Sequence, residues 1–429
     1  MRLFSPTPQP CRPIPVDQSG ASRYYSAGRP PEPKEHMRVL LASGLEGIGL
    51  GGVQTETRQL VAGLRTAGVA AGVLVNRLPD DVAHGVEHFP IDYPPAPATT
   101  GPAVAAAVAA FRPDVVHVIG GGLSFVRTAE RAAAGVPCAV TVHNVPPAEQ
   151  VGRFLYGWNG GHYLLRNARS LASAASWQWY LRAASRFAKA VCHSELVYRR
   201  VVAAVRDPGR VALIRLSGHQ DLADAAAPAA DAPAQYPSPF PLDAHPKLLT
   251  VGGIVHHKGL HDGIRAVRQL AGEFPRIHYH IIGQTRDGRY RNYVKRLVAA
   301  ADVAGHVTLT LSGSDALKAA ALRAADVFVQ PSHEEGFCLS FLEAASIVPR
   351  LVGTATGDIP GMVIGPGMRL VVPRSAEALT AGIRAALADT VPPTAVAARR
   401  ATLDERYSWD QYVRQHLDLY AQLAAAPRT

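Results

Sequence analysis

Apolar runs of strand length recur along the chain, and stretches with helical spacing follow several of them. Buried strands are predicted at residues 37–43, 72–75, 112–120, 136–144, 247–252, 277–283, 306–313 and 324–330. After the first run, Val53, Leu60 and Leu64 recur at the spacing of a helix with one buried face. Buried strands that alternate with helices favour open, parallel α/β sheets, which bind ligands at the carboxyl ends of their strands. The pattern therefore predicts an α/β protein whose functional residues follow strand ends.

The chain is long enough for two domains. Its 429 residues are 48% hydrophobic, which suffices for two cores of ordinary size. A stretch rich in Ala, Asp and Pro predicts a flexible connection between them. The expected segments are a disordered Pro-rich extension (1–36), a first domain (37–217), a linker or insertion (218–246), a second domain (247–405) and a terminal helix (406–429).

Composition narrows the class of protein. No run of 18 apolar residues predicts a membrane span, and residues 1–36 lack the apolar block of a secretory leader. The net charge of +10 is spread along the chain without a basic block, which speaks against nucleic-acid binding. The cysteines form no C-x-x-C pair, so we expect a reducing, cytoplasmic location with neither disulfides nor zinc. They are Cys11, Cys138, Cys192 and Cys338.

The segment after the strand at 324–330 carries the strongest candidate chemistry. Glu335 and Glu343, with seven residues between them, bracket an apolar run that opens with Gly336. Residues Leu339 to Ala345 are predicted to start a helix, so Glu335 lies in the strand-to-helix turn where α/β sheets bind ligands. A carboxylate near a helix N-terminus is favourable in any protein, so this position alone leaves a structural role open.

Residues 331–344 resemble the P-S-x-x-E-G-F-G-L-x-x-L-E-A signature of the retaining glycosyltransferases of family 4. The resemblance implies the GT-B fold, in which two Rossmann-like domains face each other across a ligand cleft and a C-terminal helix crosses back to the first domain. It implies that Glu335 binds hydroxyls of the donor sugar and that Glu343 binds the ribose. Gly336 and Phe337 would then lie beside the donor.

A glycine-rich loop at residues 44–52 leads into the first predicted helix. Its five glycines let the backbone approach a ligand closely, and the helix N-terminus favours anionic groups. A dinucleotide-binding enzyme would carry an acidic residue after the next strand, where Asn76 stands instead. The loop resembles the double-glycine loop of family 4, which implies that Gly51 and Gly52 approach the donor phosphate and the acceptor.

In the second domain, Lys258 and Gly259 precede a helix predicted from Leu260 to Phe274. They resemble the end of the family's V-G-R-L-x-x-x-K-G turn, whose arginine and lysine neutralise the donor diphosphate. Gly253 stands in place of that arginine, so leaving-group stabilisation should suffer unless another cation substitutes. Candidates for the substitute are His256, His257 and Arg286, and the glycines that match those lining the base and ribose are Gly283 and Gly313.

Two histidines at the predicted strands of the first domain differ in position. His117 lies within its strand and is predicted to be a hydrogen-bonded core residue. His143 ends its strand and resembles the histidine that family members place against the donor sugar, so it joins Glu335 and Lys258 as a predicted catalytic residue. Between residues 153 and 189 the chain is dense in aromatic rings, which serve either helix packing or an acceptor subsite. The predicted acceptor-binding residues are Tyr156, Trp158 and Trp177.

The resemblance extends over residues 37–423 and implies retaining transfer of a sugar from a nucleotide sugar to a soluble small molecule. No D-x-D motif occurs, so we expect no metal ion at the diphosphate and no cofactor. Residues 51–54 (G-G-V-Q) resemble transferases that use UDP-N-acetylglucosamine to glycosylate aminocyclitols in aminoglycoside antibiotic biosynthesis. A lipid or inositol acceptor stays open, as does the oligomeric state. A nucleotide-binding oxidoreductase or epimerase is the alternative from a different class.

Overall fold

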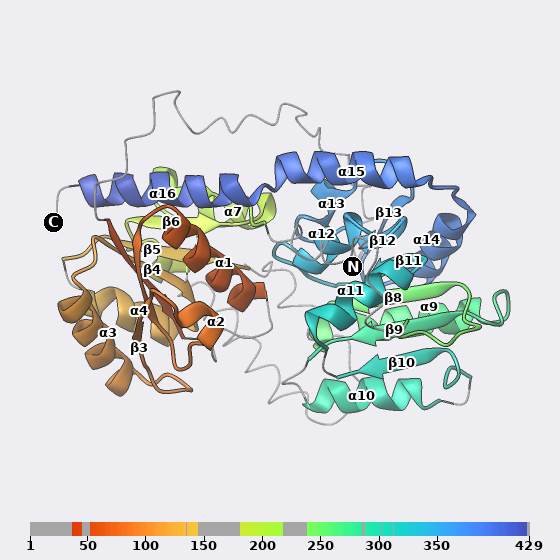
Figure 1. Ribbon diagram of the computed structural model, residues 1–429. Helices are drawn as coiled ribbons and strands as arrows, with labels where there is room; N and C mark the ends of the chain where they lie inside the picture. The colour runs from red at the N-terminus through yellow and green to blue at the C-terminus, as the bar shows by residue number, and fades with distance from the viewer. Residues whose placement is uncertain are drawn as a thin grey trace, which may run out of the picture.

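The computed structural model of the protein describes residues 37–44, 52–133, 135–144, 181–217, 238–284, 288–300, 302–311 and 313–426. Within these residues the chain forms two parallel sheets in succession, each packed against helices (Figure 1). The last strand of the first sheet ends at Leu213, and the first strand of the second begins at Lys247. The predicted α/β class with two doubly wound sheets is confirmed.

The first sheet has seven parallel strands in the order β3-β2-β1-β4-β5-β6-β7. Its strands are β1 (Arg38–Ser43), β2 (Ala70–Leu74), β3 (Glu87–Phe89), β4 (Val115–Gly120), β5 (Cys138–Val142), β6 (Lys189–Cys192) and β7 (Val211–Leu213). Its helices are α1 (Gly52–Thr66), α2 (Asp80–Ala83), α3 (Pro97–Phe111), α4 (Leu123–Ala132) and α7 (Glu195–Val202). The strand order reverses between β1 and β4, so their carboxyl ends form the switch point of this sheet.

Alternation along β1 gives the first sheet two buried faces. Val39 and Leu41 pack in one apolar cluster with side chains of α1, whereas Leu40 and Ala42 pack in another with side chains of α3 and α4. Because helices cover both faces, a central strand can be apolar throughout. All of β4 is buried, including His117, whose ring nitrogens bond the hydroxyls of Tyr420 (2.7 Å) and Thr141 (2.9 Å). The prediction of a hydrogen-bonded core histidine is confirmed.

The second sheet has six parallel strands in the order β10-β9-β8-β11-β12-β13. Its strands are β8 (Lys247–Val251), β9 (His278–Ile282), β10 (Val307–Thr310), β11 (Val327–Gln330), β12 (Arg350–Thr354) and β13 (Met368–Val371). Its helices are α9 (Leu260–Leu270), α10 (Gly288–Val298), α11 (Asp315–Ala324), α12 (Leu339–Ala345), α13 (Ile359–Met362) and α14 (Ala376–Ala388). Here the strand order reverses between β8 and β11.

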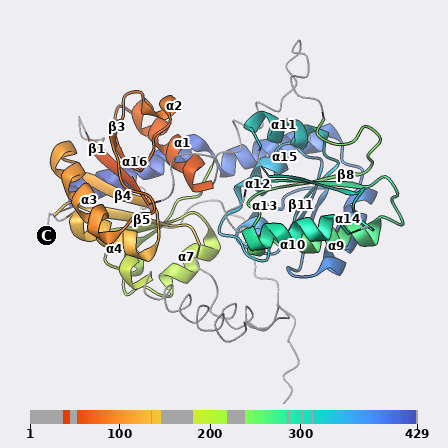
Figure 2. The same cartoon turned by 90° about the horizontal axis from the view of Figure 1, so that it is seen from below.

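The last two helices connect the two units. Helix α15 (Pro393–Arg406) packs against α12 of the second unit, and α16 (Trp409–Ala425) packs against α1 and β4 of the first. Figures 1 and 2 show them in line along one side of the molecule. A further tie is the hydrogen bond from the Glu195 backbone N–H at the start of α7 to Asp358 Oδ1, at 3.0 Å. The chain therefore returns to the first unit at its end.

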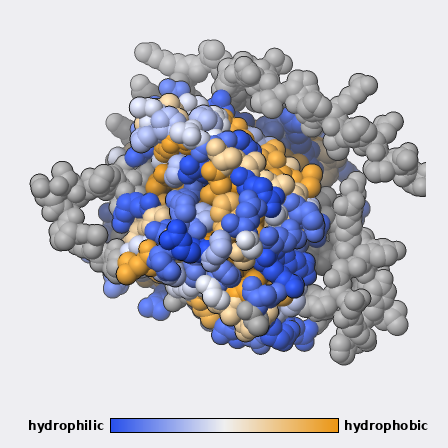
Figure 3. Space-filling model, turned by 90° about the vertical axis from the view of Figure 1, so that its right-hand side faces the viewer, coloured by the Kyte–Doolittle hydropathy of each residue, from blue (hydrophilic) through white to orange (hydrophobic). Residues whose placement is uncertain are grey.

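Hydrophilic residues cover most of the face shown in Figure 3, and hydrophobic residues form smaller areas among them. Leu242, Leu370 and Val372 are large apolar residues of the second unit that are exposed. Among the described residues, no helix combines the length and the apolar character that crossing a membrane requires.

Candidate active site

The two predicted charges of the second domain lie where its sheet reverses strand order. Lys258 ends a short 3₁₀ turn (His256–Lys258) after β8, and Glu335 lies in the loop after β11. Strand β8 pairs directly with β11, so the two loops leave neighbouring strand ends. Ligands bind at such reversal points because the connections diverge to opposite faces of the sheet. The fold thus brings together two residues that are 77 positions apart in the sequence.

Lys258 and Glu335 form an ion pair with two hydrogen bonds. Lys258 Nζ donates to Glu335 Oε1 at 2.7 Å and to Oε2 at 2.8 Å. Oε1 also accepts from the Ser332 hydroxyl at 2.5 Å and from Gln330 Nε2 at 3.1 Å. The lysine side chain is 17% exposed and the glutamate side chain 6%. Glu335 is therefore held in one orientation by three side chains instead of lying free at a helix start.

The pKa values of both partners agree with an ionised pair. Burial favours the neutral form of Glu335, but the adjacent Lys258 charge and the hydrogen bonds overcome it and lower the pKa of the carboxyl. Burial likewise opposes the charge of Lys258, and the attraction of Glu335 raises the lysine pKa above its ordinary value. Both groups therefore carry their charge at neutral pH.

A glycine lets the two loops of this pair pack closely. Gly259 has a positive φ of 62°, and a Cβ added there would lie 2.0 Å from the carbonyl oxygen of Pro331. The neighbouring His333 backbone N–H donates to the His257 carbonyl at 2.7 Å. Any larger residue at 259 would push the Lys258 turn away from the Glu335 loop.

The Glu335 loop also meets the first domain. A Cβ added to Gly336 would lie 2.1 Å from the carbonyl oxygen of His143, so the loop after β11 touches the end of β5. Nearby, the Cβ position of Gly52 at the start of α1 lies 3.8 Å from a methyl carbon of Leu339. The structure thus brings the predicted residues Gly52, His143 and Gly336 to one junction between the two domains.

The remaining residues of the signature segment differ in their surroundings. Glu343 lies on α12, partly buried, and forms no hydrogen bond or ion pair through its side chain with another described residue. Burial raises its pKa to about 7, and the Lys318 charge opposes this only in part. The ring of Phe337 is buried in a T-shaped contact with Tyr407, 5.6 Å between centroids. The phenylalanine therefore packs in the core at the junction of α15 and α16.

The two predicted glycines of the second domain, Gly283 and Gly313, follow strand ends. Gly283 follows β9 and packs against the residue after β8, since a Cβ added to it would lie 1.7 Å from the Gly252 carbonyl oxygen. A Cβ added to Gly313 would lie 2.9 Å from a side-chain carbon of Ile282. By contrast, the nearest atom to a Cβ on Gly253 is 3.7 Å away, and its backbone φ is not positive. Position 253 therefore has room for a Cβ atom.

One candidate substitute for the missing arginine is a poor cation. Burial, with the charges of His333 and Arg374, lowers the pKa of His256 to about 4, so this ring is neutral near pH 7. His257 is exposed beside Lys258.

Several predicted residues lie outside the described part of the chain, so their places are not assigned: Gly51, Arg286, Tyr156, Trp158 and Trp177.

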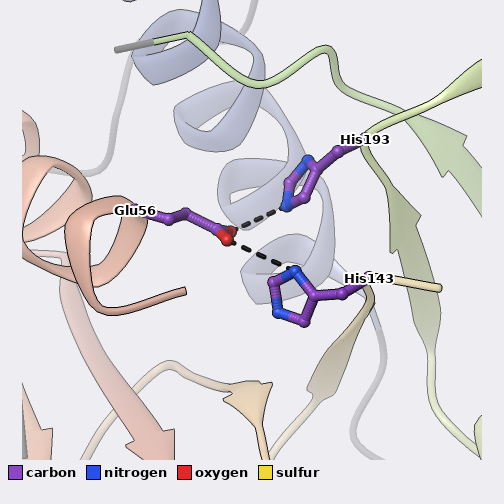
Figure 4. A group of neighbouring side chains, drawn as sticks. All are labelled: Glu56, His143 and His193. Atoms are coloured by element: carbon purple, nitrogen blue, oxygen red, sulfur yellow. Dashed lines mark hydrogen bonds and ion pairs between the residues drawn. The ribbon is translucent and has the colours of Figure 1, made fainter. Parts of the chain in front are cut away.

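A second group of ionisable side chains lies at the carboxyl ends of the first sheet. Glu56 on α1, His143 after β5 and His193 after β6 point toward one another (Figure 4). His193 Nε2 lies 2.7 Å from Glu56 Oε1, and His143 Nδ1 lies 3.5 Å from Glu56 Oε2. Burial opposes ionisation of Glu56, but attraction to His193 and His143 lowers its pKa to about 2. The carboxylate is therefore ionised although it is fully buried.

Glu56 and His193 are absent from the predicted site. The sequence does carry a signal for Glu56, since Val53, Glu56 and Leu60 share the helical spacing of the buried face of α1. A carboxylate on such a face needs a basic partner. His193 follows the apolar run of β6, which is the position that singled out His143 after β5.

Two family models match the chain, one on each domain. Residues 50–216 match the model described as Glycosyltransferase Family 4, and residues 237–404 match Glycosyl transferases group 1. A phosphatidyl-myo-inositol mannosyltransferase of Mycolicibacterium smegmatis is 26% identical over 39% of this chain and 43% of its own. A D-inositol 3-phosphate glycosyltransferase of Kineococcus radiotolerans is 29% identical over 42% of this chain and 45% of its own. The chain spans less than half the length of these curated relatives.

Solved structures resemble the whole two-domain fold. Sucrose-phosphate synthase of Thermosynechococcus elongatus has a TM-score of 0.70 at 20% identity, covering 91% of this chain and 100% of that one. The Anabaena protein HepE, solved in complex with UDP and glucose, has a TM-score of 0.64 at 16% identity, covering 90% and 100%. These likenesses define the fold as GT-B, the architecture of two facing Rossmann-like domains. With a matching model on each domain, the chain belongs to glycosyltransferase family 4.

Proposed function

We propose that this protein transfers a sugar from a nucleoside diphosphate donor to a small-molecule acceptor, with retention at the anomeric carbon. The observation that carries the proposal is the Lys258–Glu335 pair at the strand reversal of the second sheet. The ammonium group and the carboxylate lie side by side, as the diphosphate and the sugar do in such a donor. Lys258 would bind the diphosphate, and Glu335 would accept hydrogen bonds from the sugar hydroxyls.

The chemical step needs no group beyond the donor and the acceptor. The bond from the anomeric carbon to the diphosphate oxygen breaks, and the acceptor oxygen bonds to the same face of an oxocarbenium-like centre. The leaving phosphate takes the proton of the acceptor hydroxyl. Lys258 stabilises the charge that develops on the diphosphate, a role for which a preorganised, buried cation is effective. We therefore propose that donor binding needs no added divalent ion.

His143 is proposed to line the site without acting as an acid or base. Its Nε2 lies 2.5 Å from the carbonyl oxygen of Ile119, and its Nδ1 faces Glu56. Both ring nitrogens therefore face protein groups. The backbone of His143 contacts Gly336, so the residue fixes where the Glu335 loop meets the first domain.

We propose UDP-N-acetylglucosamine as the donor and an aminocyclitol, as in aminoglycoside antibiotic biosynthesis, as the acceptor. The G-G-V-Q run at residues 51–54 supports this pair. The complex of the HepE protein with UDP and glucose supports a uridine nucleotide for this fold.

An inositol phosphate is the second candidate acceptor. It is favoured by the similarity to a D-inositol 3-phosphate glycosyltransferase. Inositols and aminocyclitols are both polyhydroxylated six-membered carbocycles, so the two candidates differ mainly in charge. An aminocyclitol brings cations and an inositol phosphate brings an anion.

A donor and acceptor panel tests the proposal. The first experiment measures hydrolysis of UDP-, GDP- and ADP-sugars by the purified protein. Candidate acceptors are then added, and mass spectrometry identifies the products. We expect UDP-N-acetylglucosamine to be consumed fastest, an aminocyclitol to gain one sugar, and the NMR spectrum of the product to show a retained anomeric configuration. A folded protein that neither hydrolyses nor transfers any of these sugars would contradict the function. Consumption of another nucleotide sugar would replace the donor and leave the reaction class intact.

A further inference from the structure

The Glu56 cluster of the first domain (Glu56, His143 and His193) contains a carboxylate with hydrogen bonds to only one of its two oxygens among the described residues. Glu56 Oε1 accepts a hydrogen bond from the Tyr412 hydroxyl at 3.0 Å and lies 2.7 Å from His193 Nε2. Glu56 Oε2 is buried and receives no hydrogen bond from any described residue, although His143 Nδ1 lies 3.5 Å away. A buried carboxylate oxygen without a hydrogen bond is costly, so a cation placed at this atom would be favourable.

The histidines of the cluster are oriented by their outer nitrogens. His193 Nδ1 lies 2.7 Å from the Ile214 carbonyl oxygen, and His143 Nε2 lies 2.5 Å from the Ile119 carbonyl oxygen. A carbonyl oxygen can only accept, so each of these ring nitrogens carries its hydrogen. Backbone carbonyls hold metal-binding histidines in this way. At 2.7 Å from the ionised Glu56 oxygen, His193 Nε2 also carries a hydrogen as long as no ion is bound. An ion that binds between the rings would displace that proton, and the inner nitrogen of each ring would then offer a lone pair.

We propose that Glu56, His143 and His193 form a binding site for one divalent transition-metal ion of the Zn²⁺ class. The ion would lie among His193 Nε2, His143 Nδ1 and a Glu56 oxygen, which are all within 4.8 Å of one another. Two imidazoles and one carboxylate are a ligand set that Zn²⁺ accepts, with water in the fourth position. The ion would join α1 to the ends of β5 and β6. This inference goes beyond the proposed sugar transfer and does not depend on it.

The ligand atoms lie near the separations of a zinc site. Zinc bonds of about 2.0–2.1 Å to nitrogen and oxygen place tetrahedral ligands about 3.3 Å apart. The observed separations are 2.7 Å from His193 Nε2 to Glu56 Oε1 and 3.5 Å from His143 Nδ1 to Glu56 Oε2. The carboxylate must therefore turn to offer one oxygen to the ion, or bind it through both. The His143 side chain is 28% exposed while that of Glu56 is fully buried, so an ion would enter past His143.

A second histidine–carboxylate cluster in the other domain gives the contrast. It consists of Asp262, His261 and His333, whose possible ligand atoms also lie within 4.8 Å of one another. There, Arg374 Nη1 lies 3.2 Å from His333 Nδ1, and because arginine can only donate, the hydrogen of His333 is on Nε2 and bonds Asp262 at 2.7 Å. Asp262 also accepts from Arg265 at 3.2 Å. This carboxylate already has donors and two guanidinium groups nearby, so it needs no metal ion.

Cobalt binding tests the inference without donor or acceptor. Wild-type protein is stripped with a chelator, dialysed and titrated with Co²⁺, whose ligand-field absorption reports coordination by nitrogen and oxygen, and Zn²⁺ is then added to displace it. We expect saturation at a single Co²⁺ per chain and full displacement by Zn²⁺. Because the assay measures binding alone, failure of the transfer reaction would leave its result unchanged.

Three variants locate the ion. Glu56→Gln should abolish the absorption, and Asp262→Asn, the same change in the other cluster, should leave it unchanged. His143→Ala removes a partly exposed ligand and should weaken binding by at least the roughly 10–100-fold that loss of an outer partner of a metal ligand costs. Circular dichroism checks that each variant folds. If Glu56→Gln does not fold, the Co²⁺ affinity of His143→Ala serves as the test. Absence of stoichiometric uptake by the wild type, or uptake that survives both first-domain changes, would overturn the proposal.

Discussion

Two buried carboxylates, one in each domain, lie beside basic side chains but are satisfied differently. In the second domain both oxygens of Glu335 accept from Lys258, and Ser332 and Gln330 add donors to one of them. In the first domain only one oxygen of Glu56 has donors among the described residues. The described residues thus give both oxygens of Glu335 hydrogen-bond donors and leave Glu56 Oε2 without one.

The difference indicates what each site can bind. The Lys258–Glu335 pair is neutral as a whole, so a ligand must offer an anion to the lysine and hydroxyl donors to the glutamate, as a nucleotide sugar does. The Glu56 cluster offers a buried carboxylate and two imidazole rings that can release protons to a metal ion, which suits a cation. Changes that remove one charge at a time should separate these two behaviours.

The largest effect is expected for Lys258→Ala. Loss of a preorganised cation at the leaving diphosphate should lower turnover by roughly 10²-fold or more. It also leaves Glu335 buried without its partner, which should cost about 3–5 kcal/mol of unfolding free energy. Steady-state transfer and urea unfolding measure the two effects. Lys189→Ala, which removes a lysine bonded to the Gly209 carbonyl far along the first sheet, is the control. If the turnover of Lys258→Ala lay within a few-fold of that of this control, Lys258 would not bind the leaving diphosphate.

Glu335→Gln should lose most transfer while donor is saturating. The amide keeps the size of the side chain but loses the charge that Lys258 and the sugar hydroxyls require. Because the glutamine oxygen still accepts one hydrogen bond from Lys258, we expect a smaller loss of stability than for Lys258→Ala. Initial rates at saturating donor give the answer, and a rate near that of the wild type would remove Glu335 from the site.

Gly253→Arg should restore part of the function lost in Lys258→Ala. Position 253 has room for a Cβ and an ordinary backbone, and it stands where the resemblance to family 4 places an arginine. Combined with Lys258→Ala, it should recover roughly 10-fold in turnover, since a second cation supplies some of the missing charge stabilisation. The double variant is compared with Lys258→Ala under identical donor concentrations. Turnover that does not rise would mean that position 253 is remote from the diphosphate.

The smallest effect concerns Glu343, a carboxylate with no ion-pair partner among the described residues. Burial raises its pKa from 4.5 to about 7. Its contribution to stability is therefore complete below about pH 4.5 and is lost as the pH rises through 7. Glu343→Gln should gain about 1–3 kcal/mol of unfolding free energy over the wild type between pH 5 and pH 8. Urea unfolding at both pH values measures this. An equal difference at the two values would show that Glu343 titrates normally.

Much of the fold follows from the apolar pattern. Each predicted run became a strand because sheets covered on both faces select continuous apolar segments, as in β4. Helix α12 spans the predicted Leu339–Ala345. Helix α9 ends at Leu270, four residues before the predicted Phe274, and Gly272 follows this end. A glycine disfavours continuation of a helix.

The site was predictable only in part. The signature at residues 331–344 singles out Glu335, and the turn before Leu260 singles out Lys258. Their hydrogen bonds depend on how β8 and β11 pair, which a sequence does not state. The Glu56 cluster draws on α1, β5, β6 and α16, and no local pattern joins residues so far apart. The acceptor-binding residues Tyr156, Trp158 and Trp177 remain predictions, because they lie outside the described part of the chain.

The most direct test of the central claim is a comparison of nucleotide affinities by calorimetry. UDP and uridine are each titrated into the wild type and Lys258→Ala, with GDP and ADP and their nucleosides as alternatives if the uridine pair does not bind. If Lys258 binds the diphosphate, the preference for the diphosphate over its nucleoside should fall in the variant, while the nucleoside binds equally to both proteins. An unchanged preference, in a variant that is folded, would contradict the account.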